Sequence, residues 1–206
     1  MTIQTLQVGP IMTNCYLLCD ETSKVCALID PGDDAPHIEK LLAASGCTLT
    51  AIFLTHGHFD HTSAVRPLLE NHDVPVYIHE ADTCEGRGGE LKFQRLTDGH
   101  QRFYQEGDTL EVGALRLRVL ETAGHSKGSV CLLVEGENTL FSGDTLFRCS
   151  CGRCDFPGGD YREMLASLGR LAGLEGNLRV LPGHDAETTL DFERRVNPYM
   201  RQGSKG

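Results

Sequence analysis

The chain has 206 residues, of which 40% are hydrophobic and 23% are charged, and its formal net charge is −10 at pH 7. This composition is typical of a globular protein and excludes wholesale disorder, and the scattered basic side chains of an acidic chain give no support to nucleic-acid binding. The N-terminal residues lack a secretory leader and no apolar run reaches the roughly 18 residues of a membrane span, so we expect one cytoplasmic domain, residues 1–206, without a membrane partner.

The first half of the chain is predicted to contain strands followed by helices. Extended segments separated by turn residues predict a β-meander over residues 2–8, 14–20 and 25–30. A helix is predicted over residues 34–45, because Pro36 stands near its start and Gly46 follows its last apolar residues. The other predictions for this half are a strand at 50–55, a helix after Asp60, a strand at 74–79 and an irregular stretch from 85 to 106.

The second half repeats this order of strands and helices. Its predicted elements are strands near 109–112, 115–121, 129–134 and 138–142, a helix at 160–172, a strand at 178–181 and a final helix from about 187. Two sets of strands followed by helices predict a sheet-rich core with helices on its outer faces.

Ligand-type side chains are concentrated where the strand at 50–55 is predicted to end, in the segment THGHFDH. If this segment is still extended, His56 and His58 lie on one side and can bind one cation, while Gly57 allows a close approach of the backbone. Asp60 and His61 then point in other directions and suit a second cation.

The same pattern, an apolar run followed by small turn residues and a ligand-type residue, recurs three times downstream. His125 ends LRVLETAGH, Asp144 ends TLFSGD and His184 ends LRVLPGH. Strand ends commonly carry binding residues, because the loops there can vary while the strands stay rigid. Seven candidate ligands are too many for one tetrahedral ion, so we expect two ions that share one carboxylate. Imidazole and carboxylate suit zinc but also iron, manganese or cobalt.

The motifs THGHFDH, GHSKGS, FSGDTLF and PGHD resemble the successive motifs of the metallo-β-lactamase superfamily, over nearly the whole chain. This resemblance implies an α+β fold, a four-layer αββα sandwich with the metals at one edge. It further implies one ion held by His56, His58 and His125, a second held by Asp60, His61 and His184, and Asp144 bridging the two. The segment CGRCDFPGGD resembles the glyoxalase II-like hydrolases and the related persulfide dioxygenases.

The predicted function is that of a dinuclear metal-dependent hydrolase that cleaves thioesters by attack of a metal-bridged hydroxide. Two divalent ions, with zinc favoured over iron or manganese, can lower the pKa of water towards 7, and a thiolate leaving group needs little acid assistance. Asp60 is interpreted as a ligand that also orients the hydroxide. By resemblance to short glyoxalase II-like enzymes, the partner is a small-molecule substrate, S-lactoylglutathione or a similar acyl thioester. Arg153 is then the candidate for pairing with a substrate carboxylate.

Two other functions also fit the sequence. A persulfide dioxygenase would hold one Fe(II) through His56, His125 and Asp144, a two-histidine, one-carboxylate set with open positions. A metal-binding or thiol-sensing module without turnover would use the cysteine cluster at 149–154 as its reader. Nothing in the sequence specifies an oligomeric state.

Two further features are interpreted structurally. The cluster of Cys149, Cys151 and Cys154 lacks the paired C-x₂-C of zinc modules, so it is interpreted as a loop near the active site. By resemblance to the family, the turn that holds Asp30 lies near the metals and Asp30 could contact the site, but we interpret Asp30 as part of a structural turn built on Pro31 and Gly32.

Overall fold

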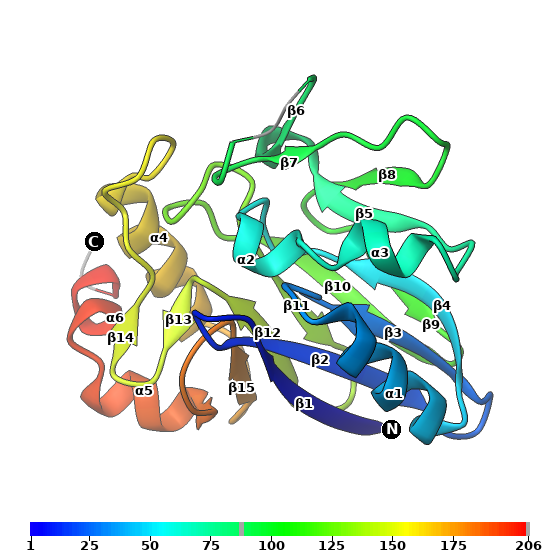
Figure 1. Cartoon of the computed structure of the whole chain (residues 1–206). Helices are drawn as coiled ribbons and strands as arrows, with labels where there is room; N and C mark the ends of the chain where they lie inside the picture. Colours follow the sequence, from blue (N-terminus) through cyan, green and yellow to red (C-terminus); the bar gives the residue numbers. More distant parts are fainter. Residues whose placement is uncertain (87–88, 205–206) are drawn as a thin grey trace.

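Two six-stranded β-sheets lie face to face, with helices on both outer sides (Figure 1). The computed structural model describes residues 1–86 and 89–204. The first sheet contains, in spatial order, β1 (Thr2–Val8), β2 (Thr13–Asp20), β3 (Val25–Ile29), β4 (Thr48–Phe53), β5 (Val76–His79) and β8 (Gln101–Tyr104). The second contains β16 (Thr188–Thr189), β15 (Arg179–Pro182), β12 (Thr139–Gly143), β11 (Val130–Val134), β10 (Leu115–Glu121) and β9 (Thr109–Val112).

Short elements complete the fold. Two small ladders pair β6 (Thr83–Cys84) with β7 (Phe93–Gln94) and β13 (Leu146–Phe147) with β14 (Ser150–Cys151). The helices are α1 (Ala35–Ser45), α2 (Phe59–Thr62), α3 (Val65–Leu69), α4 (Tyr161–Ala172), α5 (Leu190–Val196) and α6 (Pro198–Gly203), with a 3₁₀ turn η1 (Glu80–Asp82). In the described parts of the chain, no helix has both the length and the apolar character needed to cross a bilayer.

Three apolar cores hold the layers together, and the side chains of β2 contribute to two of them. All eight of its residues are buried, because alternate side chains enter different cores. Leu17 packs with α1 and α3 in the outer core of the first sheet, whereas Leu18 enters the central core between the sheets. On the other side, Met164 and Leu168 of α4 pack against the second sheet in a third core. The layer order is therefore the expected αββα.

Two predictions about secondary structure are wrong. The stretch from 85 to 106 was expected to be irregular, but its residues 101–104 form β8, which adds to the first sheet beside β5; residues 87 and 88 of this stretch lie outside the described ones. The final helix was expected from about 187, but residues 188–189 form β16 and the helix is divided at Asn197. The break follows from Pro198, which lacks the N–H needed to continue a helix and starts α6 instead.

The strand directions bring several chain segments to one edge of the sandwich. β4 runs parallel to β3 and β5 in the first sheet, and β12 runs parallel to β15 in the second. Because the two strands of a parallel pair end on the same side, the loops that follow β12 and β15 lie close together. The segment after β4 meets the second sheet across the sandwich at β11, where the backbone N–H of Val130 donates to the carbonyl of Thr55 at 2.9 Å.

Candidate metal centre

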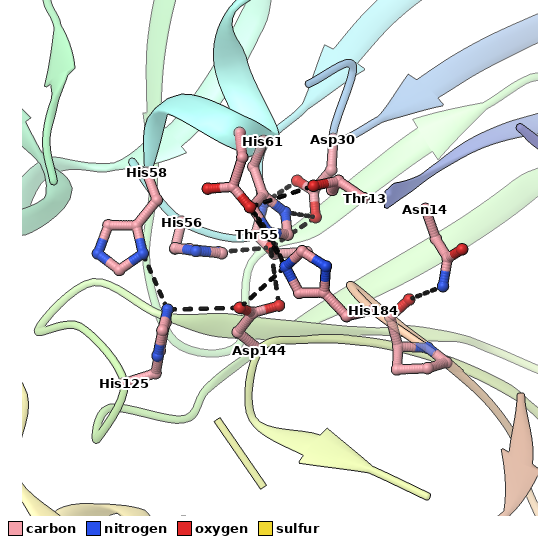
Figure 2. A network of polar contacts seen from close by, with 12 residues as sticks. Thr13, Asn14, Asp30, Thr55, His56, His58, His61, His125, Asp144 and His184 are labelled. Atoms are coloured by element: carbon pink, nitrogen blue, oxygen red, sulfur yellow. Dashed lines mark hydrogen bonds and ion pairs between the residues drawn. The ribbon is translucent and has the colours of Figure 1, made fainter. Parts of the chain in front are cut away.

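All seven predicted ligands lie together at this edge of the sandwich. Figure 2 labels the five histidines and Asp144. Five of the seven ligands are buried, and Asp60 and His184 are half-buried. Their ligand atoms form three overlapping groups, each with all atoms within 4.8 Å of one another. These groups are His56, His58 and His125; His56, His61 and Asp144; and Asp60, His61 and His184.

The first group is a cluster of three imidazoles with nitrogen atoms directed at one another. The ring of His125 is held in one orientation because its Nδ1 lies 2.7 Å from the carbonyl oxygen of Arg153. This leaves Nε2 facing the site. That Nε2 lies 2.8 Å from Nδ1 of His58. The ring of His56 completes the cluster and presents Nε2, because its Nδ1 contacts the hydroxyl of Thr55 at 3.1 Å. His56 and His58 thus converge as their alternate spacing predicted.

The group of Asp60, His61 and His184 has the dimensions of one face of a coordination tetrahedron. Asp60 Oδ2 lies 3.2 Å from His184 Nε2 and 3.5 Å from His61 Nε2, and the two nitrogen atoms are 3.4 Å apart. Ligands about 2.1 Å from a tetrahedral ion lie about 3.4 Å from one another. The three atoms therefore already stand at the separations that a bound cation would impose.

Asp144 lies between two of these groups, the first formed by His56, His58 and His125 and the second by Asp60, His61 and His184. Its Oδ2 is 3.5 Å from Nε2 of His125 and 3.5 Å from Nε2 of His184, and its Oδ1 is 3.4 Å from Nε2 of His61. One carboxylate therefore faces a histidine of the first group and two of the second, which is the position expected of a bridging ligand.

A metal fits this set of donor atoms because two of them have unsatisfied hydrogen-bonding capacity. Nε2 of His56 and Oδ1 of Asp144 are buried yet have no hydrogen-bond partner among the described residues. A buried polar atom without a partner is costly, so such atoms at one point indicate a missing ligand. The nitrogen and oxygen donors are those that divalent transition metals take.

Without metal, the pKa values of His58 and His184 are shifted in opposite directions. Burial, together with the nearby ring of His125, lowers the pKa of His58 to about 4. His184 behaves in the opposite way: burial favours its neutral form, but the carboxylates of Asp144 and Asp60 outweigh this and raise its pKa to about 10. Protons on the histidines nearest the carboxylates thus supply part of the positive charge that a metal would bring.

Two buried aspartates that support the ligands were not recognised as site residues in the sequence. Asp30 does more than form the predicted turn: its Oδ2 lies 3.0 Å from Nδ1 of His61, and it accepts bonds of 2.7 Å from the backbone and hydroxyl of Thr55. Asp82 accepts from the backbone N–H groups of Gly57 at 2.9 Å and Gly128 at 2.7 Å. No ligand pattern marks Asp82, because an aspartate after a strand is also an ordinary turn residue.

The loops approach so closely that glycine is required at two points. A Cβ at Gly57 would collide with the backbone carbonyl of Asp82, which agrees with the close approach predicted there. At Gly183 a Cβ would collide with Oδ1 of Asp144 and lie 2.7 Å from the ring of His61. These glycines let the loops bring both sides of the site into contact.

A cavity of about 340 Å³ opens over the ligand atoms. Its walls are largely apolar and include Ile11, Phe59, Leu91, Phe147 and Phe156. Arg153 also lines it, stacked over the ring of Phe156 with its guanidinium carbon 4.4 Å from the ring centroid. The guanidinium is already engaged, because its Nε and Nη2 donate to the two carboxylate oxygens of Asp155 at 2.9 and 2.8 Å.

The cysteine cluster lies beside this cavity. Cys149 is exposed in the turn between β13 and β14, and Cys151 and Cys154 are half-buried against the core under α4. The thiol of Cys154 points to the carbonyl of Gly152 at 3.5 Å. In the part of the chain that the structure describes, the groups able to hold a metal contain no cysteine.

Comparison with known proteins gives one family. The model of the metallo-β-lactamase superfamily matches residues 8–184. The chain is 30% identical over 220 residues to the hydroxyacylglutathione hydrolase GloC of Haemophilus influenzae, covering 99% of this chain and 100% of that one. It superposes with a TM-score of 0.86 on the BLEG-1 B3 metallo-β-lactamase, at 33% identity, covering 97% of this chain and 99% of that one. The TM-score with TTHA1623 in a di-iron-bound form is 0.80, at 37% identity and with coverages of 95% and 99%.

Proposed function

The chain belongs to the metallo-β-lactamase superfamily, and we propose that it is a single-domain, dinuclear hydrolase of acyl thioesters. The observation that carries the proposal is the position of Asp144 between two ligand groups, with Oδ2 3.5 Å from Nε2 of His125 in one group and 3.5 Å from Nε2 of His184 in the other. A single ion would leave part of this buried set unpartnered, whereas two ions sharing one carboxylate use all seven residues.

Each ion would be held by residues from both sheets. We assign His56, His58 and His125 to one ion, Asp60, His61 and His184 to the other, and Asp144 to both. Zinc is favoured, with iron or manganese as alternatives, and the di-iron form of TTHA1623 supports a pair of ions. When bound, the ions supply Lewis acidity and a source of hydroxide at neutral pH.

The chain's own contribution is to hold the site rigid and to orient the attacking water. Asp60 is anchored by the hydroxyl of Thr13, which donates to its Oδ2 at 3.1 Å. Although burial opposes its ionisation, the adjoining His184 and His61 hold the pKa of Asp60 below its usual range. An ionised Asp60 accepts a hydrogen bond from water and so directs its lone pair at the substrate.

Thioesters are favoured as the substrate class by the composition of the cavity wall. In the described part of the chain, the wall offers no general acid apart from the assigned ligands and the exposed Glu90. A thiolate is a good enough leaving group to depart without strong acid assistance, unlike an amine. The name of the GloC relative, a hydroxyacylglutathione hydrolase, supports the same class.

The test is metal analysis combined with activity. Chelator-treated protein is reloaded with zinc, iron or manganese, its metal content is measured, and S-lactoylglutathione and simple acyl thioesters are assayed. We expect two ions per chain and thioester turnover that His56→Ala abolishes. His72→Ala is the matched control, because His72 pairs with Glu39 away from the site.

Three results would overturn the proposal. One is less than a few turnovers per hour on every thioester with two ions bound, which favours a non-catalytic metal or thiol sensor. A second is one iron per chain with oxygen uptake that depends on glutathione persulfide, which indicates the dioxygenase. The third is hydrolysis of a β-lactam faster than that of any thioester.

A further inference from the structure

The cavity above the ligand atoms is built to receive an apolar group. Phe147 and Phe156 are half-buried in its wall, and Ile11 and Phe59 are left 49% and 41% exposed. Large apolar side chains exposed together around one cavity are covered favourably by an apolar ligand, which gains about fourfold in binding for each methylene group it buries. A cavity of about 340 Å³ holds a small acyl or thiol group.

Apart from the assigned metal site, the charged side chains of the cavity wall do not favour an anionic group. Arg153 is the single lysine or arginine among the described residues that line it, and Glu90 adds a negative charge to the rim. Asp155 occupies the Nε–Nη2 side of the Arg153 guanidinium through two hydrogen bonds, in the geometry with which a guanidinium would bind a substrate carboxylate. Asp155 thereby balances the charge of this cation and weakens its attraction for a substrate carboxylate.

We propose that the enzyme prefers thioesters whose groups next to the reacting carbonyl are apolar and uncharged. Asp155 contributes to this preference by holding the guanidinium of Arg153, which could otherwise bind a negatively charged group. Asp155 is thus a specificity-determining residue that acts through Arg153. The inference depends on the proposed thioesterase function and concerns which thioesters the enzyme prefers. It replaces the earlier expectation that Arg153 pairs with a substrate carboxylate.

The first experiment compares two substrates of equal length on the zinc-loaded protein. The hexanoyl and adipoyl thioesters of N-acetylcysteamine both have six carbons in the acyl chain and differ by a terminal carboxylate. We expect kcat/KM to be at least about tenfold higher for the hexanoyl ester, because its end group is buried without losing the hydration of a charge. An equal or higher value for the adipoyl ester would overturn the inference.

The second experiment removes the charge of Asp155. Asp155→Asn should raise kcat/KM for the adipoyl ester relative to the hexanoyl ester by about two- to fivefold, the range expected from freeing an exposed ion pair. The gain should appear as a lower KM, because substrate binding is what changes. The double variant Asp155→Asn with Arg153→Met should cancel it, and an unchanged ratio in the single variant would contradict the role of Asp155.

The two levels of the proposal fail in different ways. If protein with two bound ions hydrolyses neither ester nor S-lactoylglutathione, the thioesterase function itself is wrong. If it hydrolyses them but prefers S-lactoylglutathione to the lactoyl thioester of N-acetylcysteamine, the function stands and the inference about the cavity is wrong.

Discussion

Two buried aspartates at the same edge of the sandwich, Asp82 and Asp144, differ in how completely their carboxylate oxygens are hydrogen-bonded. Asp82 accepts hydrogen bonds from Gly57, Gly128 and the hydroxyl of Ser126, the last at 2.6 Å, so each of its oxygens has a donor. Asp144 is also buried, but among the described residues its Oδ1 has no hydrogen-bond partner, and its Oδ2 faces the rings of His125 and His184.

This difference separates a structural carboxylate from a ligand. A buried charge that the protein satisfies completely holds loops in place, whereas one left incomplete is ready to bind something from solution. Side-chain type cannot make this distinction, because both residues are aspartates that follow strands.

The largest expected effect comes from removing the incomplete carboxylate. Asp144→Ala should lower kcat/KM by about 10³-fold or more, because both ions lose a ligand and the nucleophile is no longer generated at neutral pH. Metal analysis should show fewer than two ions per chain. Full metal content with near-normal activity would show that Asp144 is not a metal ligand, and the contrast with Asp82 would then have no functional meaning.

The complementary change at Asp82 should act on stability. Asp82→Ala leaves the buried backbone N–H groups of Gly57 and Gly128 without an acceptor, whereas the hydroxyl of Ser126 can still donate to that of Ser129. We expect the free energy of unfolding of the metal-free protein to fall by about 3 kcal/mol. Urea unfolding measures this. Glu137→Ala, an exposed residue on a β-turn, is the control and should change stability by less than about 0.5 kcal/mol. A loss for Asp82→Ala no larger than the control's would show that Asp82 is not structural.

Asp30 should show an intermediate behaviour, because it is satisfied by the fold and yet touches a ligand. Asp30→Asn weakens the orientation of the His61 ring and should reduce metal affinity about 10- to 100-fold. Zinc titration against a competing chelator measures this. Asp33→Asn, on the same turn but exposed, is the matched control. Equal affinities for the two variants would contradict an orienting role.

The smallest expected effect is at a carboxylate far from the metal centre. Hydrogen bonds from the backbone of Ala114 and the hydroxyl of Ser23 lower the pKa of Asp20 from 3.8 to about 2. A lowered folded-state pKa stabilises the protein above the unfolded-state value and loses that contribution as pH falls through the folded-state value. The stability difference between wild type and Asp20→Asn should therefore be full above about pH 4 and shrink towards pH 2. Urea unfolding of the metal-free proteins tests this, and a difference that grows on acidification would be contrary to it.

Local pattern predicted most of the strands and selected the seven candidate ligands that the structure brings together. It failed where the conformation of a segment depends on its neighbours in the fold. The polar segment QRFY was not predicted to be a strand, because only β5 beside it makes residues 101–104 extended. The final helix was predicted as one element from about residue 187, although Pro198 already marks a second start.

By itself the sequence determined which side chains could bind metal, since residue type and strand-end position are local properties. Only the tertiary structure decided which carboxylates are complete and which are not, and that Arg153 is engaged by Asp155. The physical reason is that hydrogen-bond satisfaction and ligand spacing depend on atoms from both sheets: Asp144 follows β12, His61 follows β4 and His184 follows β15, and the few ångströms between them exist only after the layers have packed.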